Sequence, residues 1–349
     1  MPNHVELLDL LLSNRGISPD ERERFLNPSY ENDLHDPFKM LNMERVCVRI
    51  FEAIKAKEKI LIYSDYDCDG IPAAVIMHDF FKKINYENFS VYIPDRHDEG
   101  YGLHHGAIDQ FIKDEVNLLI TFDLGITAIK ETAKAQNAGI DVIITDHHLP
   151  QGEIPPAYAI LNSKQDGDLY PDKMLCGAGV AYKLIQAMIK KYGGYWKINN
   201  GWEKWLLDMV GVATLADQVP LLNENRVLAY YGLKVLQKGR RPGLSELFKK
   251  AGVNIAKLNE EDITFTLAPR INAASRMDDP MKAFLMLSTT DLVGAKVLSD
   301  HLVKINDERK IMVAHIMKEV KKTIGKRDEK SIIVIGNPSW RIGVLGIIA

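Results

Sequence analysis

The chain has 349 residues, of which 46% are hydrophobic and 26% charged, with a formal net charge of −3 at pH 7. This composition indicates a globular protein of about two domains, without an apolar run long enough for a membrane span and without a secretory leader. Three widely spaced cysteines, Cys47, Cys68 and Cys176, argue against a disulfide framework and favour a cytoplasmic location. The net charge leaves a nucleic-acid partner open, because an acidic metal cluster can mask basic surface elsewhere.

The first elements alternate helix and strand. Residues 1–45 are polar and irregular, and we expect a lead-in that packs on the first domain. Helical spacing of apolar residues predicts a helix over 43–57, and the apolar run Ile60–Ser64 has the length of one buried strand. A helix at about 71–83 and a strand at 89–93 follow.

Two later apolar runs repeat this opening pattern. Residues 116–122 end in Asp123, and residues 141–145 end in Asp146, with a helical segment at 127–138 between them. Buried β-branched runs that alternate with helices predict an α/β fold with a mostly parallel sheet flanked by helices. Ligands of such sheets collect beyond the carboxyl ends of the strands, so the acidic motifs should share one edge.

The second half of the chain is predicted to be mainly helical. We expect a strand at 157–161, a helix that opens within 175–180 and reaches about 191, and helices at 202–215 and 226–238. An irregular basic stretch at 269–276, a long connector helix at 291–324 and a new strand at 331–335 follow. The chain then divides into the lead-in (1–45), an α/β domain (46–280), a connector-helix region (281–328) and the start of a second α/β domain (329–349).

The first strand is followed by three aspartates at every second position, Asp65, Asp67 and Asp69. If the chain stays extended there, the three carboxylates point to one side and Tyr66 and Cys68 to the other. Like charges at such a short separation raise the free energy of the folded chain in a low-dielectric environment unless cations neutralise them. The pattern therefore predicts a divalent metal site at the end of this strand.

A strand-end aspartate such as Asp123, taken alone, is more often a helix cap or turn former. Three strand-end acidic motifs together favour one shared metal site. Carboxylates with an imidazole suit Mn²⁺ or Mg²⁺ better than zinc. Because His147 and His148 follow a strand, their rings should diverge, so that one can bind metal while the other faces the substrate.

Three further features admit both a functional and a structural interpretation. Arg270 and Arg276 could hold phosphate oxygens with their forked donors, or form surface ion pairs. Gly177 and Gly179 begin a predicted helix and could offer backbone N–H groups to an anion, or allow close helix packing. The pair at 104–105 lacks the strand-end position, and we interpret it as structural or peripheral.

The motifs, taken in order, resemble those of the DHH phosphoesterase superfamily. The segments S-D-Y-D-C-D-G (64–70), F-D-L-G (122–125), T-D-H-H (145–148) and A-T-L-A-D-Q-V-P-L (213–221) are similar to its first four motifs. The segments at 99–103, 176–184 and 268–277 resemble the RecJ-type single-strand exonucleases within that superfamily. The ordered set is far more specific than any one motif.

The resemblance implies two divalent metal ions, Mn²⁺ or Mg²⁺, and a role for each matching residue. The metal ligands it implies are Asp67, Asp69, Asp123, His147 and Asp217, with Asp123 bridging and Asp65 supporting the cluster. Asp146 would orient the cluster, and His148 would contact the scissile phosphate, which makes Asp123, Asp146 and His148 the expected catalytic residues. Arg270, Asn272 and Arg276 would bind the substrate.

From the residues alone, we expect two-metal hydrolysis of a phosphoester. The resemblance adds single-stranded DNA as substrate, 5′-to-3′ polarity, release of mononucleotides, and a single-strand-binding protein or helicase as partner. Two alternatives are an oligoribonuclease or nucleotide phosphatase of the same superfamily, and an inactive scaffold of a replication or repair complex. Residues 338–349 resemble the start of the family's second domain, with Arg341 where His is common, so we expect a catalytic-core fragment or a shortened relative.

Overall fold

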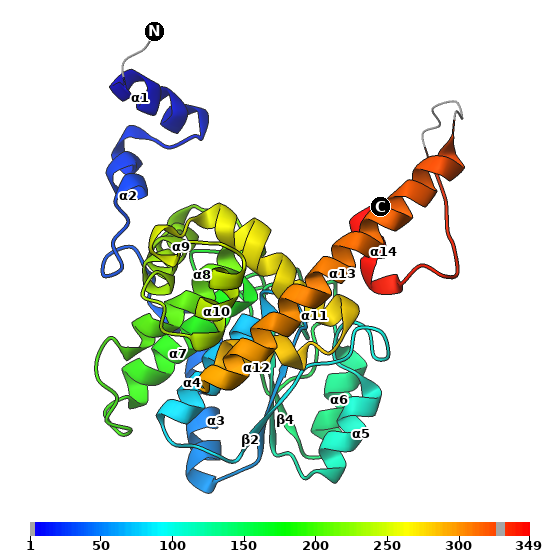
Figure 1. Ribbon diagram of the computed structural model, residues 1–349. Coiled ribbons are helices and arrows are strands. Elements are labelled where there is room, and N and C mark those ends of the chain that lie inside the picture. The colour runs from blue at the N-terminus through cyan, green and yellow to red at the C-terminus, as the bar shows by residue number, and fades with distance from the viewer. Residues whose placement is uncertain (1–3, 326–331) are drawn as a thin grey trace.

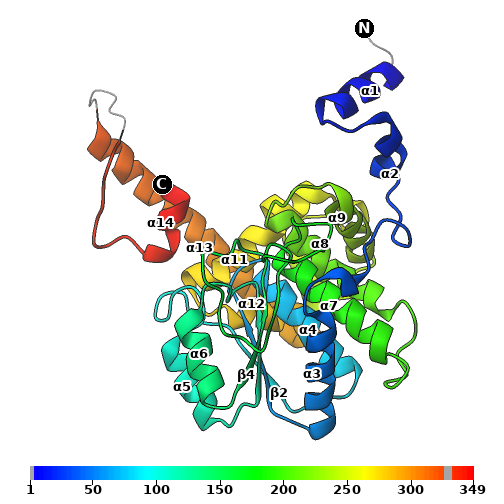
Figure 2. The ribbon, with the colours of Figure 1, turned by 180° about the vertical axis from the view of Figure 1, so that it is seen from behind.

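The computed structural model describes residues 4–325 and 332–349 (Figures 1 and 2). Its centre is a five-stranded parallel sheet with the strand order β2-β1-β3-β4-β5. The strands are β1 (Ile60–Ser64), β2 (Phe89–Tyr92), β3 (Leu118–Phe122), β4 (Asp141–Thr145) and β5 (Ala159–Leu161). The predicted α/β class and the order of the strands along the chain are confirmed.

Helices cover both faces of the sheet, and alternate strand residues supply the two cores. Ile60 and Ile62 of β1 belong to the larger core, which includes residues of α3 (Met43–Ala56), α4 (Gly70–Lys83) and α7 (Gly177–Tyr192). Leu61 and Tyr63 belong to the smaller core under α5 (His105–Lys113) and α6 (Ile129–Asn137). Burial on both faces explains why the strands are apolar throughout instead of alternating.

A helical layer extends the larger core. It comprises η3 (Trp202–Leu206), α8 (Leu207–Ala216), α9 (Asn223–Leu236), α10 (Pro242–Lys250), η4 (Ile255–Lys257), α11 (Ala268–Met277) and α12 (Met281–Ser288). The predicted long helix is α13 (Leu292–Ile324), and α14 (Ile342–Ile348) folds back beside it (Figure 1). None of the helices in the described ranges, α13 included, is both long and apolar enough to cross a membrane.

Two predicted elements are wrong. The stretch 269–276, expected to be irregular, lies within α11 (Ala268–Met277), which directly continues a π-helical turn, η5 (Asp262–Leu267). Pro269 lies in the first turn of α11, where a missing N–H breaks little of the helix. The strand expected at the C-terminal end does not form over Ile332–Ile335, which finds no partner strand among the described residues; Ser331 lies outside them.

The later part of the lead-in packs on the body through Phe25 and His35, among other residues. The guanidinium of Arg226 lies 3.6 Å from the centre of the Phe25 ring, and the His35 N–H donates to Glu224 Oε1 at 2.6 Å. In contrast, α1 (His4–Asn14) lies apart from the body in both views (Figures 1 and 2). The short helices η1 (Pro19–Glu21) and α2 (Arg22–Leu26) follow α1, whereas η2 (Pro37–Lys39) packs against α3 and α7.

A buried ion-pair network fixes α4, α8 and α10 relative to one another. Arg241, at the start of α10, donates through Nε to Asp208 Oδ2 of α8 at 2.7 Å and through Nη2 to Asp79 Oδ2 of α4 at 2.8 Å. Removing one member of such a network leaves a buried charge without its partner, so the three helices are held in one arrangement.

Close approach of two glycines allows α8 and α9 to pack, and it yields a stability prediction. A Cβ atom at Gly232 would lie 2.6 Å from Gly211 Cα and 2.7 Å from the Leu207 carbonyl oxygen. Overpacking of this kind costs about 1–3 kcal/mol. Gly232→Ala should therefore lower the free energy of unfolding by that amount in urea titrations.

The matched control is Gly106→Ala in α5, where an added Cβ would meet nothing within 4 Å. It should leave the free energy of unfolding unchanged or raise it by up to about 1 kcal/mol. Equal effects of the two substitutions would contradict the proposed close approach of α8 and α9.

Candidate metal centre

Three strand-end aspartates lie in register along the carboxyl edge of the sheet. Each backbone N–H donates to the last residue of the neighbouring strand: Asp65 to the Phe122 carbonyl at 3.1 Å, Asp123 to Thr145 at 2.9 Å, and Asp146 to Leu161 at 3.0 Å. The ladder of hydrogen bonds thus continues one residue past β1, β3 and β4. This places the three acidic motifs at one edge, as the sequence predicts.

The expectation that Asp65, Asp67 and Asp69 share one side of an extended chain is wrong. The chain leaves the extended conformation after Ser64, and Asp69 already has helical backbone angles (φ −111°, ψ −53°). Asp67 Oδ1 accepts from the N–H groups of Asp69 (2.8 Å) and Gly70 (3.1 Å), which starts α4. A tight turn therefore separates Asp69 from the first two carboxylates.

The site side chains form linked groups in which one ligand atom per residue lies within 4.8 Å of the others. Asp65, Asp67 and Asp123 form one group, and Asp69, His147 and Asp217 form a second. Asp123 and His147 also belong to a third group, with His148, so they connect the first two. Every residue that the resemblance implies as a metal ligand is present in these groups.

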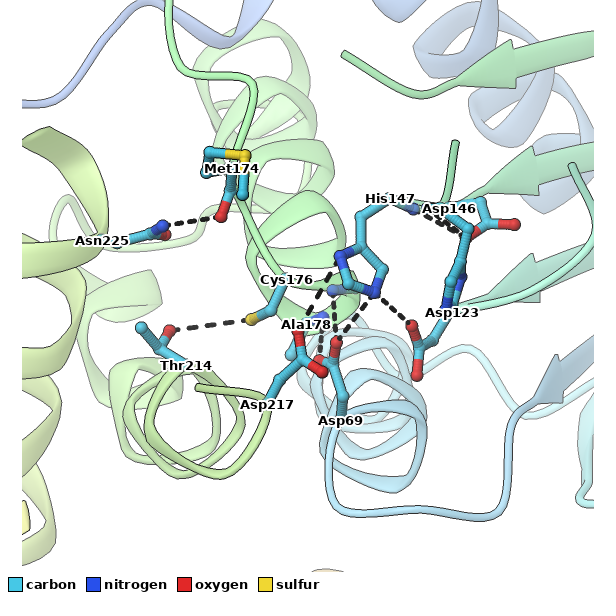
Figure 3. Close-up of polar contacts among 12 residues, drawn as sticks. Asp69, Asp123, Asp146, His147, Met174, Cys176, Ala178, Thr214, Asp217 and Asn225 are labelled. Carbon is cyan, nitrogen blue, oxygen red and sulfur yellow. Dashed lines mark hydrogen bonds and ion pairs between the residues drawn. The ribbon is translucent and has the colours of Figure 1, made fainter. Parts of the chain in front are cut away.

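The His147 ring lies at the centre of the cluster (Figure 3). Its Nε2 atom is 3.1 Å from Asp123 Oδ1 and 3.7 Å from Asp69 Oδ2, and its Nδ1 atom is 3.9 Å from Asp217 Oδ2. Asp217 comes from the end of α8, so the cluster joins the sheet edge to the helical layer.

The prediction that the rings of His147 and His148 diverge is also wrong. Their centroids are only 4.5 Å apart with the planes tilted by 59°, because the chain has left β4 and strand alternation no longer applies. Asp146 holds the second ring: its Oδ1 lies 2.8 Å from His148 Nδ1 and accepts from the N–H groups of His147 and His148. Its Oδ2 accepts from the Ile126 N–H at 2.9 Å.

The electrostatics of the site favour a bound cation. Burial, followed by repulsion from neighbouring carboxylates, raises the pKa of Asp65 and Asp123 well above the usual range. Burial, with Asp69 and Asp67, raises the pKa of Asp217 to about 7. Burial also lowers the pKa of His147, which keeps its ring neutral and able to coordinate metal. A cation would reverse the cost of ionising these carboxylates.

Two buried oxygen atoms and one strained residue fit the same interpretation. Asp65 Oδ1 is buried and has no hydrogen-bond partner among the described residues, and the buried Asp123 Oδ1 accepts no well-aligned hydrogen bond there although His147 Nε2 lies 3.1 Å away. Asp123 has a left-handed backbone (φ 62°), which is uncommon for a residue other than glycine and concentrates at functional sites. Oxygen ligands with one neutral imidazole suit Mn²⁺ or Mg²⁺, so the residues present fit the ions that the sequence predicts.

His148 differs from His147 in exposure and charge. Its side chain is 45% exposed, against 11% for His147. The hydrogen bond with Asp146 raises the pKa of His148, against the opposing effect of burial. Because Asp146 engages Nδ1, Nε2 is the ring nitrogen available to a substrate. Tyr101 lies beside the ring, with centroids 6.2 Å apart.

Of the predicted substrate residues, the structure brings Arg276 toward the cluster. Burial lowers its pKa, as do the neighbouring guanidinium groups of Arg96 and Arg309, while Tyr66 and Asp67 oppose the shift. Arg276 also donates from Nη1 to the Gly343 carbonyl of α14 at 2.8 Å.

Arg270 and Asn272 remain less defined. Arg270 donates from Nη1 to the Thr266 carbonyl one turn earlier, and burial lowers its pKa while Asp307 opposes this. The buried Oδ1 of Asn272 has no hydrogen-bond partner in the described part of the chain.

Sequence reasoning missed Arg96, whose guanidinium lies 4.9 Å from the centre of the Tyr66 ring. Arg96 follows β2 by four residues, so it lies beyond the same sheet edge as the acidic motifs. The position of Arg96 shortly after a predicted strand was the sequence signal that could have identified it as a site residue. The pair at 104–105, interpreted as peripheral, is outside the cluster: His105 pairs with Glu131 at 3.0 Å. All three cysteines are buried and free.

The anion that meets the start of α7 is a side chain of the cluster itself. The N–H of Gly177 donates to Asp69 Oδ2 at 2.6 Å, and that of Ala178 donates to Asp69 Oδ1 at 2.7 Å. Of the two interpretations of the Gly177 and Gly179 segment, these hydrogen bonds support anion binding, with an anion that the chain itself supplies.

The chain is similar to known proteins in sequence. Residues 59–214 match the model of the DHH family, N-terminal domain. The chain is 38% identical over 344 residues to the single-stranded-DNA-specific exonuclease RecJ of Bacillus subtilis, covering 98% of this chain and 42% of that protein. It is 31% identical to the Escherichia coli protein of the same name, covering 98% and 61%. The chain therefore spans about half the length of these relatives.

Solved structures show the same similarity. A RecJ exonuclease bound to manganese superposes with a TM-score of 0.80 at 29% identity, covering 89% of this chain and 76% of that one. RecJ from Thermus thermophilus in complex with Mn²⁺ gives 0.82 at 27% identity, covering 97% and 47%. The chain therefore carries a DHH-family N-terminal domain and resembles RecJ exonucleases in sequence and fold over nearly its whole length.

Proposed function

We propose that this chain is a metal-dependent phosphodiesterase, specifically a single-stranded-DNA exonuclease of 5′-to-3′ polarity that releases mononucleotides. The observation that carries the proposal is the convergence of carboxylates with His147 at one edge of the sheet. The residues come from the ends of β1, β3 and β4, the start of α4 and the end of α8, and Asp65, Asp69, Asp123 and His147 are buried. The names of the relatives supply the substrate, and the manganese complexes of RecJ support the choice of metal.

In this proposal Asp67 and Asp123 would hold one divalent ion with Asp65 in support, and Asp69, His147 and Asp217 would hold a second. Bound divalent ions supply Lewis acidity that activates water and neutralises charge on a phosphate. The chain's own contribution is to hold these ligands in a buried, fixed arrangement.

The remaining polar residues act on the substrate. His148, held by Asp146 and with a raised pKa, is placed to donate from Nε2 to a phosphate oxygen where negative charge develops. Arg276 offers a guanidinium for neighbouring phosphates, and we assign the same role, on the resemblance alone, to Arg270 and Asn272.

Two further proposals follow from the resemblance and from composition. A single-strand-binding protein or a helicase is the proposed protein partner. A cytoplasmic location is proposed because three free thiols suit a reducing compartment.

Substrate class can be tested by digesting a long 5′-labelled single-stranded DNA and a set of dinucleotides side by side with Mn²⁺. The proposal predicts rapid release of labelled mononucleotide from the long strand. Cleavage confined to dinucleotides would instead indicate an oligoribonuclease-like or nucleotide phosphatase activity, and release of the 5′ label only after the rest of the strand is degraded would contradict the polarity.

Asp123→Asn should reduce cleavage more than about 10³-fold, because it removes a charge that two of the three ligand groups share. Asn keeps the shape of the side chain and tolerates a left-handed backbone. The fold should survive, since the substitution removes a buried charge whose ionisation is unfavourable without metal. Mn²⁺-dependent activity at the wild-type rate would overturn the assignment of Asp123.

The two adjacent histidines should separate metal binding from substrate contact. His148→Ala should lower cleavage about 10²- to 10³-fold while leaving Mn²⁺ affinity in isothermal titration near the wild-type value. His147→Ala should lower both. A loss of Mn²⁺ affinity in His148→Ala equal to that in His147→Ala would contradict the division of roles.

Metal binding should stabilise the folded chain, because it neutralises carboxylates that are costly to ionise in the metal-free protein. At a pH near 7.5, Mn²⁺ at about 100 times its Kd should contribute about 2.7 kcal/mol, seen as a rise of several degrees in Tm relative to EDTA. Mg²⁺ in place of Mn²⁺ serves as a second metal condition. An unchanged Tm together with no heat of Mn²⁺ binding would favour an inactive scaffold.

A further inference from the structure

We propose that the N-terminus of α7 is the element that holds Asp69 in position to bind metal, and that Gly177 is a positioning residue whose missing side chain makes room for Asp123. This inference rests on the proposed function, since it concerns the same metal ligands. It assigns a role to a segment outside the four acidic motifs.

Two backbone N–H groups at the start of α7 bind the Asp69 carboxylate. The backbone N–H groups of two successive residues, Gly177 and Ala178, donate to the two oxygens of one carboxylate at 2.6 and 2.7 Å. The Asp69 side chain is only 2% exposed, so these two donors replace solvent. A helix N-terminus is also a favourable place for a negative charge, because its N–H groups have no partner within the helix. Asp69 Oδ2 also lies 3.7 Å from His147 Nε2, so the carboxylate that α7 binds is part of the metal-ligand cluster.

Space, and not backbone conformation, explains the glycine at position 177. The φ angle of Gly177 is not positive, so a residue with a side chain could adopt the same backbone conformation. A Cβ atom there would lie 2.6 Å from Asp123 Cβ and 2.7 Å from Asp123 Oδ1. Asp123 has little freedom to move, since its left-handed backbone is fixed by the hydrogen bond to Thr145. The side chain that would be displaced is the one shared by two ligand groups.

The start of α7 is itself anchored to the helices beside it (Figure 3). Asn225 Nδ2 of α9 donates to the Met174 carbonyl at 2.6 Å, and Cys176 Sγ lies 3.7 Å from Thr214 Oγ1 of α8. Because α8 ends at Asp217, the packed helices hold Asp69 through the start of α7 and also carry Asp217, which belongs to the same ligand group as Asp69. Supporting contacts of this kind orient metal ligands, and their loss typically costs about 10- to 100-fold in metal affinity.

The test compares Gly177→Ala with Gly179→Ala, which adds the same methyl group two residues later in the same helix. At Gly179 the new Cβ would meet Leu175 Cβ at 3.4 Å and Cys176 Sγ at 3.7 Å, both ordinary contacts. Isothermal titration with MnCl₂ should show affinity lowered about 10- to 100-fold in Gly177→Ala and unchanged in Gly179→Ala. Wild-type Mn²⁺ affinity in Gly177→Ala, or equal losses in the two variants, would overturn the proposal.

A second variant separates positioning from folding. Ala178→Pro removes the N–H that donates to Asp69 Oδ1 and leaves Gly177 beside Asp123 unchanged, and Pro is tolerated in the first turn of a helix. Its Mn²⁺ affinity should also fall, while Tm in EDTA stays within a few degrees of wild type. If both variants lose Mn²⁺ affinity only in proportion to a loss of Tm in EDTA, the role of the segment is structural and the proposal is wrong.

This readout is independent of catalysis. Wild-type protein that binds Mn²⁺ but cleaves no single-stranded DNA would contradict the proposed function, yet the effect of Gly177→Ala on affinity would still decide the positioning role. Conversely, wild-type affinity in Gly177→Ala would remove the positioning role and leave the proposed exonuclease function intact.

Discussion

The crowding of carboxylates at one buried edge of a parallel sheet is the constraint on which the rest of this structure depends. Burying an ion costs several kcal/mol even after the protein relaxes, and like charges add to that cost. Two helix N-termini offset part of it: the start of α4 donates to Asp67 and the start of α7 to Asp69. Each contributes about 0.3–2 kcal/mol, which is too little for the whole cluster. Divalent cations are the natural remaining source of compensation.

The architecture follows from this need. Parallel strands bring Asp65, Asp123 and Asp146 to the same edge because the hydrogen-bond ladder runs one residue past each strand. Three helices that cover the larger core each have one end at this edge of the sheet. The starts of α4 and α7 contribute backbone N–H donors, and the end of α8 contributes Asp217. The buried network of Arg241 with Asp79 and Asp208 joins α4 to α8 far along both helices from that edge, so the ligands they carry keep a fixed separation.

The sequence was most informative where one local pattern decides the structure. Apolar runs ending in acidic residues predicted β1, β3 and β4 and the sharing of one edge. Period-2 reasoning failed for Asp67 and Asp69 because it assumed an extended chain where a turn begins α4, and it failed for the His147 and His148 rings for the same reason. Helix α11 was not predicted because its sequence contains several small residues and Pro269, and such residues are also common in loops. The hydrogen bonds from α7 to Asp69 join residues more than a hundred positions apart, which no local pattern reports.

The central claim is that this edge of the sheet binds divalent metal through the grouped carboxylates and His147. The most direct measurement is an anomalous difference map from crystals of this chain grown with MnCl₂, recorded on both sides of the manganese absorption edge. The account predicts anomalous peaks between Asp65, Asp67 and Asp123 and between Asp69, His147 and Asp217, absent from crystals soaked in EDTA. A map from manganese-saturated crystals with no peak among these side chains would contradict it.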